Sequence, residues 1–247
     1  MTPKITLFLA ALMLLTSCAL DDGYMDSNTG TGGSMARFTI KDNHLYTVDY
    51  NNLNTFDISN PEDIKHNQRL NVGFGIETIF PYEDKLFLGA RNGMYIFSLE
   101  NPGNPVEMSY TDHFWSYDPV VVQGNYAYVT LRNDDFSWRD ANQLQIYEVT
   151  NSYNPELVAE YDMDGPGGLA IDDEKLFICD KNALKVYSLS NHIELDIENP
   201  VATFPIKAID VIPNDSLLHV IAEDGFYNYS FENNEMELLG KISIPLN

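Results

Sequence analysis

Apolar and polar residues alternate along most of the chain from Ser34 onward. The alternation occurs in short runs rich in Val, Ile, Tyr and Phe, such as "KLFLGA" and "MYIFSLE", and Asn, Asp, Gly and Pro separate these runs. A period of two, bounded by turn-forming residues, is the pattern of short β-strands joined by tight turns. No segment of comparable length has the helical period. The pattern therefore predicts an all-β protein.

The runs form a repeating unit. Five segments align with one another, with spacings of 41, 41, 49 and 42 residues between the equivalent positions Leu45, Leu86, Ala127, Leu176 and Leu218. A second run follows each segment after a short turn such as "RNG" or "EDG", and these turn residues favour antiparallel hairpins. One further strand on each side gives four strands per repeat, which in the second repeat are "IETIF", "KLFLGA", "MYIFSLE" and "VEMSYT".

Five repeats of four short strands predict a five-bladed β-propeller of four-stranded antiparallel blades over residues 34–247. A stacked solenoid is the alternative, although it would leave its terminal edges exposed. The position at which the ring closes is not evident, because repeat one begins and repeat five ends at the same phase.

Several short motifs resemble a known family. The segments "LYTVD", "LNTFDISNP", "GGSMARFTI" and "GNYAYVTLR" look like those of LVIVD-repeat proteins, a β-propeller family common among bacterial surface lipoproteins. The resemblance covers nearly all of residues 32–247 and is weakest in the fifth repeat. It implies the propeller fold and a place at the cell envelope, but it implies no particular activity.

The N-terminus has the features of a lipoprotein signal peptide. Lys4 precedes an apolar run of 11 residues, Ile5 to Leu15, and "LTSC" ends at Cys18. This predicts a signal peptide over residues 1–17, and its run is too short to span a bilayer comfortably. By resemblance to bacterial lipoproteins, Cys18 becomes the first mature residue and carries a diacylglycerol and an amide-linked acyl chain such as palmitate. Two or more such chains attach a protein firmly to a membrane.

Residues 18–33 follow the cleavage site and contain mainly Gly, Asp, Ser, Asn and Thr, which predicts a flexible tether. Asp21 and Asp22 resemble a surface-export signal of some Gram-negative lipoproteins. We therefore expect the outer membrane, on its periplasmic side or at the cell surface.

The composition excludes one class of partner and limits the role of cysteine. With 37 acidic and 14 basic residues the net charge is −23, and there is no cluster of Lys and Arg. Nucleic acid is thus not an expected partner, because a polyanion needs such a cluster. The chain has two cysteines; once Cys18 is acylated, Cys179 has no disulfide partner and is predicted to be a buried packing residue.

The third repeat contains an insertion. Where the other repeats turn within two or three residues, it runs from Arg132 to Gln143, which accounts for the spacing of 49. Long loops are common places for binding groups. We interpret this loop as a contact surface for a protein or a glycan, and the alternative is that its aromatic rings cover the edge of a blade. The predicted binding residues are Arg132, Phe136, Trp138, Arg139 and Asp140.

A second candidate site lies on the predicted inner strands. Arg37, Glu77, Asp118, Gly168 and Asp210 occupy corresponding positions there. Three carboxylates around a channel could carry out glycoside hydrolysis or hold calcium, although nothing else in the sequence supports a bound ion. The alternative is a solvated, charge-balanced channel mouth.

Motifs for other chemistry are missing from the sequence. The five histidines are scattered, with no pair at metal-ligand spacing, and there is no catalytic triad, phosphate-binding loop or dinucleotide fingerprint. We therefore predict a non-catalytic binding scaffold without metal or cofactor. The alternative is a carbohydrate-active hydrolase that uses Glu77, Asp118 and Asp210.

Overall fold

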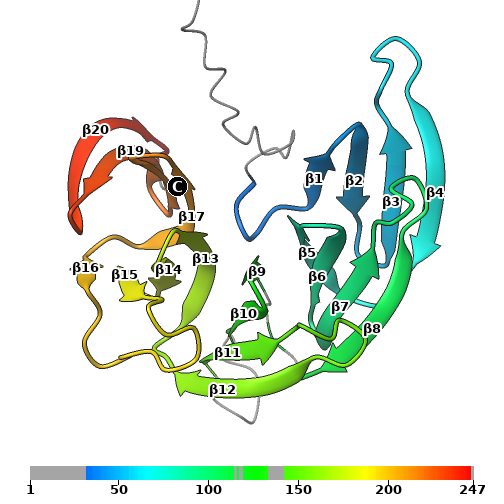
Figure 1. The fold of residues 1–247 in the computed structure, drawn as a ribbon. Coiled ribbons are helices and arrows are strands. Elements are labelled where there is room, and N and C mark those ends of the chain that lie inside the picture. The colour runs from blue at the N-terminus through cyan, green and yellow to red at the C-terminus, as the bar shows by residue number, and fades with distance from the viewer. Residues whose placement is uncertain (1–31, 114–115, 117–118, 133–141, 246–247) are drawn as a thin grey trace, which may run out of the picture.

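The computed structural model describes residues 32–113, 116, 119–132 and 142–245. Within them, twenty strands form five antiparallel sheets, each made of four strands that are consecutive in the chain. The fold prediction is confirmed: these sheets are the blades of a β-propeller, arranged around a common centre (Figure 1).

The five blades follow one another in the order of the sequence. Blade 1 is β1 (Phe38–Lys41), β2 (His44–Val48), β3 (Asn52–Asp57) and β4 (Lys65–Asn71); blade 2 is β5 (Ile76–Tyr82), β6 (Lys85–Ala90), β7 (Gly93–Ser98) and β8 (Val106–Asp112); blade 3 is β9 (Val120–Gln123), β10 (Tyr126–Leu131), β11 (Gln143–Glu148) and β12 (Glu156–Asp162); blade 4 is β13 (Pro166–Asp172), β14 (Lys175–Asp180), β15 (Ala183–Ser188) and β16 (Ala202–Phe204); blade 5 is β17 (Ala208–Asn214), β18 (Leu217–Ala222), β19 (Gly225–Glu232) and β20 (Glu235–Ser243).

The turn between the first two strands has the same conformation in every blade. One residue of each turn has a positive φ, between 48° and 57°, and these residues are Asp42, Glu83, Gly124, Asp173 and Asp215. Their spacings equal those of the repeat, so the same local geometry recurs five times. Tight turns of antiparallel hairpins require such residues.

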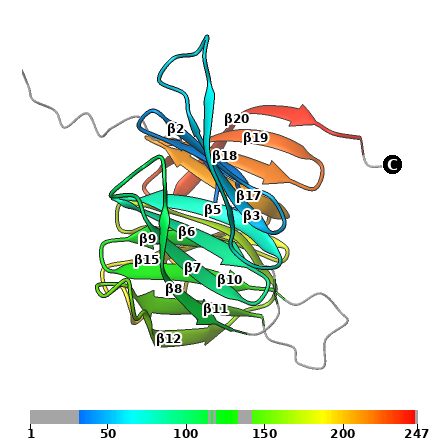
Figure 2. The same ribbon diagram turned by 90° about the vertical axis from the view of Figure 1, so that its right-hand side faces the viewer.

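Buried apolar residues fill the spaces between neighbouring blades. Four clusters lie between blades 1 and 2, 2 and 3, 3 and 4, and 4 and 5. Phe97, Tyr128 and Phe177 are among their fully buried members. The blades therefore stack side by side, each burying one face against the next (Figure 2).

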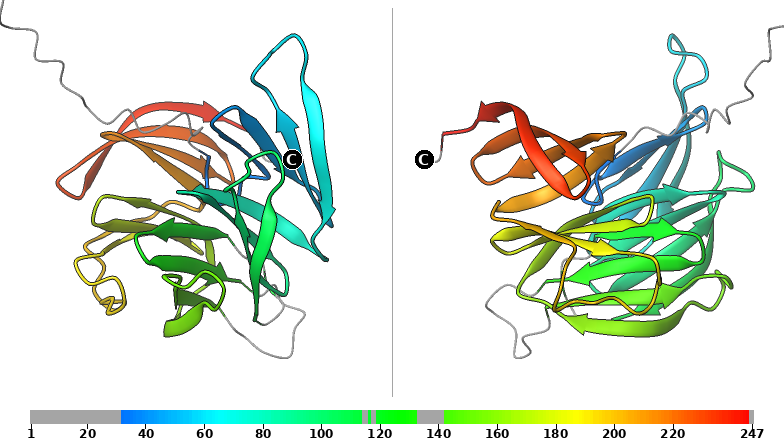
Figure 3. Two further views of the ribbon diagram at one scale, coloured as in Figure 1. Left: turned by 45° about the vertical axis from the view of Figure 1, so that its right-hand side comes forward. Right: turned by 60° about the vertical axis from the view of Figure 1, so that its left-hand side comes forward.

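Among the described residues, no such cluster joins blade 5 to blade 1. The face of blade 5 that points away from blade 4 instead exposes Ile221, Phe226 and Ile242, which lie directly opposite one another across the strands β18, β19 and β20. Blade 5 contacts the rest of the ring through blade 4 and through the segment that enters β1 (Figure 3). This interval between blades 5 and 1 is the seam of the ring.

Residues 33–36 bridge the seam. Ser34 Oγ donates a hydrogen bond to Asp210 of β17 at 3.1 Å and accepts one from the Leu169 amide of β13 at 2.8 Å. On the other side, the Ile79 amide of β5 donates to the Ala36 carbonyl at 3.0 Å. The chain thus closes the ring with the segment before its first strand and not with an exchanged strand.

Candidate functional site

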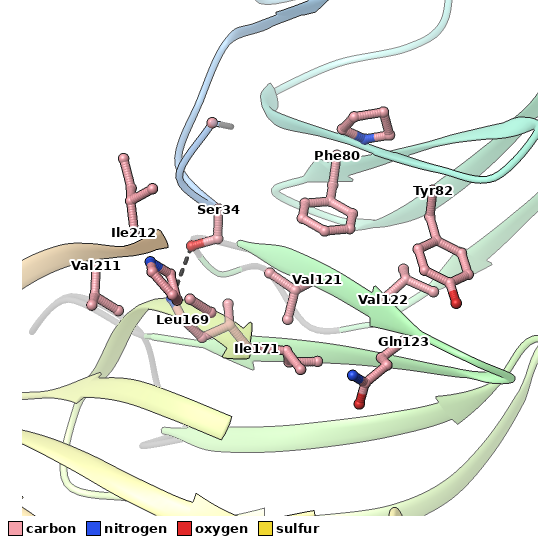
Figure 4. Close-up of a pocket in the computed structure, with 14 residues that line it drawn as sticks. Ser34, Phe80, Tyr82, Val121, Val122, Gln123, Leu169, Ile171, Val211 and Ile212 are labelled. Carbon is pink, nitrogen blue, oxygen red and sulfur yellow. Dashed lines mark hydrogen bonds between the residues drawn. The ribbon is translucent and has the colours of Figure 1, made fainter. Parts of the chain in front are cut away.

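The inner strands surround a central cavity of about 310 Å³. Its described lining has no charged side chain and is largely apolar, with Phe80, Val121, Ile171 and Ile212 pointing inward (Figure 4). None of the positions considered from the sequence for a charged channel mouth, such as Glu77 and Asp210, belongs to this lining.

Asp210 lies buried next to the seam, with 5% of its surface exposed. Its carboxylate accepts hydrogen bonds from Ser34 Oγ and from the amides of Met35 and Val211. Burial raises the pKa of Asp210 to about 6, although these hydrogen bonds oppose the shift. A β-carbon on Gly168 would lie 2.3 Å from the carboxylate, so only glycine leaves room for it there.

Glu77 has a different partner. Its Oε1 accepts a hydrogen bond from Arg91 Nε at 2.7 Å, and its side chain is 10% exposed. The strand register also corrects the alignment of Glu77 with Asp210. Thr78 pairs with Gly89 in blade 2, and Asp210 pairs with Ile221 at the equivalent place in blade 5. Thr78, and not Glu77, is therefore equivalent to Asp210.

The other charged residues proposed for the channel are Arg37 and Asp118. Arg37 is exposed and directly precedes β1. Asp118 lies outside the described residues. Among the described residues, Glu77 and Asp210 are thus held by separate partners, Arg91 for the first and Ser34 for the second.

The turns between the second and third strands and the connections between blades lie at one end of the ring, because the strands alternate in direction. We call this end the upper face. Tyr50, Arg91, Arg132, Lys181 and Glu223 occupy one equivalent position there, directly after the segment equivalent to "LYTVD" in each blade.

Two aromatic rings meet on the upper face. Tyr50 and Phe74 pack edge to face with ring centroids 4.6 Å apart, and they remain 38% and 49% exposed. The Arg91 guanidinium lies over the Tyr50 ring, 5.7 Å from its centroid. Because Arg91 also binds Glu77, an aromatic pair, a cation and a carboxylate form one connected group, which we call the aromatic platform.

The connection between blades 1 and 2 holds Phe74 in place. Gly75 has a φ of +75°, and a β-carbon there would lie 3.0 Å from the Arg91 side chain. The amides of Gly75 and Ile76 both donate to the Tyr50 carbonyl, at 2.9 and 3.1 Å. The backbone therefore fixes the two aromatic residues relative to each other.

The predicted loop of repeat three begins on this same face. Arg132 directly follows β10, and a β-carbon on Gly167 of the inner strand β13 would lie 3.9 Å from its Nη1. Phe136, Trp138, Arg139 and Asp140 lie outside the described residues, as does Cys18.

Sequence reasoning did not identify the aromatic platform. Tyr50 and Arg91 come from two hairpin turns, Phe74 from the connection between β4 and β5, and Glu77 from β5 itself. Each of these three loops has only two to four residues. The signal that could have revealed it is "GFG" at residues 73–75, where an aromatic residue lies between two glycines.

Cys179 is buried, as predicted, and burial raises the pKa of its thiol well above its usual range. Within the described ranges, no group of three or more His, Cys, Asp or Glu residues could hold a metal ion. The same ranges include no helix of the length and apolarity needed to cross a membrane.

Comparison with known proteins supports the repeat and the fold. Residues 32–65 and 117–137 match the family model described as the LVIVD repeat. No curated protein sequence matches the chain.

Solved structures with the same arrangement have low sequence identity to the chain. A Lactobacillus plantarum protein superimposes with a TM-score of 0.63 at 13% identity, over 82% of this chain and 69% of that one. A candidate 6-phosphogluconolactonase from Bacteroides fragilis gives 0.62 at 9% identity, over 84% and 69%. BamB from Moraxella catarrhalis gives 0.56 at 8% identity, over 81% and 56%. At such low sequence identities, structural similarity establishes the fold alone.

Proposed function

We propose, from the premise that this chain is a five-bladed β-propeller with LVIVD repeats, that it is a non-catalytic binding scaffold of the bacterial envelope. Its partner is a protein or a glycan, which it contacts through the upper face. Cys18 carries the lipid that anchors it to the outer membrane, and residues 18–33 are the tether.

One observation carries the proposal: the exposed pair Tyr50 and Phe74 lies beside Arg91 on the upper face. Aromatic and Arg residues contribute most of the energy of many interfaces. Arg132, at which the predicted loop begins, lies on the same face, and we propose that Phe136, Trp138, Arg139 and Asp140 extend the binding surface.

The contacts of the carboxylates favour binding over hydrolysis. A glycosidase needs two carboxyl groups facing one bond of the substrate, at a separation of about 5 to 9.5 Å. Glu77 is instead paired with Arg91, and Asp210 is buried against Ser34. The hydrolase alternative requires that a Glu77→Gln variant lose a glycosidase activity that the parent has. The binding scaffold that we propose has no such activity to lose.

The position of Gly32 is compatible with the anchor. Gly32 lines the central cavity, away from the aromatic platform. A flexible chain of the 15 residues from Cys18 to Gly32 would have a root-mean-square length of about 20 Å. Such a tether would hold the propeller close to the membrane without covering Tyr50 or Phe74.

The anchor is tested by feeding cells an alkyne-labelled fatty acid. The full chain should carry the label and sediment with outer membranes, and the Cys18→Ser variant should do neither. Equal membrane attachment of both would exclude the lipid anchor.

Partner binding is tested by capture from envelope extract with the full chain in detergent. A Tyr50→Ala, Phe74→Ala double variant and a Phe136→Ala, Trp138→Ala double variant test the two parts of the upper face. Tyr153→Ala is the matched control, because Tyr153 is 70% exposed and lies in the loop before β12, at the opposite end of the ring. All variants must melt like the parent. We expect a partner that the double variants lose and the control retains; equal capture by all four proteins would contradict the proposed face.

A further inference from the structure

We propose that the central cavity is a second binding site, which takes a small neutral molecule with an apolar body and one hydroxyl group. This inference goes beyond the proposed function, because the cavity is separate from the upper face and its ligand has a different chemistry.

The cavity lies toward the end of the ring opposite the upper face. Four inner strands line it with residues near their C-terminal ends, just before the turns to the second strands of the blades. These residues are Phe80 to Tyr82 in β5, Val121 to Gln123 in β9, Leu169 to Ile171 in β13 and Val211 to Pro213 in β17. Gly32 and Ser34, which precede β1, complete the lining.

The size and the lining of the cavity suit a small apolar molecule. Its volume of about 310 Å³ is at the lower end of the range for ligand sites. At the roughly 30 Å³ that one water molecule occupies in the liquid, this volume holds about ten non-hydrogen atoms. Phe80, Val121, Ile171 and Ile212 point into it (Figure 4). Apolar cavities offer water few partners, and they bind apolar molecules instead.

Two polar side chains of the lining keep one hydrogen-bonding group free among the described residues. Tyr82 Oη accepts a hydrogen bond from the Gly124 amide at 2.7 Å, so its own O–H group remains to donate. Gln123 Nε2 donates to the Asp173 carbonyl at 2.9 Å, which leaves Gln123 Oε1 to accept. Tyr82 and Gln123 lie next to each other (Figure 4). A ligand hydroxyl group both accepts and donates, so it can bind the two side chains at once.

The charges around the cavity disfavour an anionic ligand. The described lining has no charged side chain, so an ion would lose its hydration without gaining a partner. Asp172 and Asp173 directly follow the lining residue Ile171. Burial raises the pKa of Asp172, and the nearby Asp173 and Asp215 raise it further, so negative charge is already concentrated at this end of the ring. The cavity therefore selects a hydroxyl group over a carboxylate.

The test is a titration of the full chain, held in lipid nanodiscs without detergent, with 1-octanol. Methyl NMR follows the signals of isoleucine and valine at equal free concentrations of each probe. We expect saturable shifts of the Ile171 and Ile212 signals and none of Ile64, which is 59% exposed in the loop before β4. Heptyl methyl ether has the same size but cannot donate, so it should bind about threefold or more weakly. Octanoate should bind more weakly still.

Two variants test the place of binding. Tyr82→Phe removes the free donor and should raise the dissociation constant of 1-octanol by about threefold to tenfold. Ile212→Phe fills part of the cavity and should abolish the shift of Ile171, whereas Ile64→Phe, outside the cavity, should leave it unchanged. All variants must melt like the parent. Tyr82→Phe decides the question alone if Ile212→Phe does not fold.

Several outcomes would overturn the inference: no saturable shift with 1-octanol, octanoate or octylammonium binding as tightly as 1-octanol, or unchanged affinity in Tyr82→Phe. The Tyr50→Ala, Phe74→Ala variant should bind 1-octanol like the parent, because its substitutions lie at the other end of the ring. Loss of 1-octanol binding in that variant would show that the cavity is not a separate site. Failure of this inference therefore leaves the proposed function of the upper face untouched.

Discussion

Ser34 and Asp210, 176 residues apart in the sequence, meet in a buried hydrogen bond of 3.1 Å at the seam of the propeller. Ser34 is 1% exposed and also accepts a hydrogen bond from the Leu169 amide, so one hydroxyl group joins the segment before β1 to blades 4 and 5. The other four junctions between blades are apolar clusters, whereas this one depends on a few polar contacts.

Replacing Ser34 by Ala should therefore destabilise the protein clearly, although it removes only one hydroxyl group. The change leaves the Leu169 amide without this partner and removes one donor from Asp210, at a cost of about 1–3 kcal/mol in the free energy of unfolding. Urea unfolding followed by circular dichroism measures the effect. Ser188→Ala, at an exposed position in β15, should change stability by less than about 0.5 kcal/mol. Equal effects of Ser34→Ala and Ser188→Ala would show that the contact at the seam adds nothing to the free energy of unfolding.

Asp210 should make stability depend on pH in a defined direction. Its pKa is about 6 in the folded protein and 3.8 in the reference state, so the folded state binds more protons between these values. Stability should accordingly fall as pH rises from about 4 to 6, by an amount on the order of 2 kcal/mol, and then stay level with respect to this group.

The comparison with Asp210→Asn isolates this contribution from that of the other carboxylates. The stability of the parent relative to the variant, measured by urea unfolding at several pH values, should decrease over this range. A difference that is constant, or that grows with pH, would contradict the raised pKa.

The pair of Arg91 and Glu77 should be energetically coupled. Both side chains are partly buried, at 29% and 10% exposure, so removing one leaves the other poorly compensated. A double-mutant cycle with Arg91→Met and Glu77→Gln should give a coupling energy of about 1–3 kcal/mol. The exposed pair of Lys65 and Asp63, at 66% and 65% exposure, provides the control and should give less than about 0.5 kcal/mol. Similar coupling energies in both pairs would mean that the burial of Arg91 and Glu77 does not strengthen their interaction.

The exposed face of blade 5 should limit solubility. Ile221, Phe226 and Ile242 are 42%, 37% and 68% exposed and adjacent across three strands, so they form a continuous apolar surface. An Ile242→Lys variant should remain soluble at higher ammonium sulfate concentrations than the parent, with little change in melting temperature. Val106→Lys alters an apolar residue of similar exposure, 63%, in blade 2. If Val106→Lys improves solubility as much as Ile242→Lys does, the added charge is responsible and not the loss of apolar surface on blade 5.

The repeat could be predicted from the sequence because its causes are local. Alternation and turn residues determine each hairpin, and the positive φ at Asp42, Glu83 and Asp173 recurs at the spacing of the repeat. Burial of Cys179 could be predicted because a cysteine without a disulfide partner commonly packs as a small apolar residue in the core.

The site and the seam depend on contacts that local patterns do not contain. The pairing of the inner strands shows that Thr78, and not Glu77, is equivalent to Asp210, since β5 and β17 have the same register irregularity at the same place. Tyr50, Phe74 and Arg91 become neighbours only when blade 2 packs against blade 1. Ser34 and Asp210 meet only when all five blades are in place.

The most direct test of binding through the upper face is photocrosslinking in intact cells. A benzophenone amino acid is placed at position 74 in one strain and at position 153, at the opposite end of the ring, in another. Both proteins should reach equal levels and melt alike. Our account predicts that irradiation yields a discrete adduct from position 74 and none from position 153. An adduct from position 153 alone, or from neither position, would contradict a binding function of the upper face.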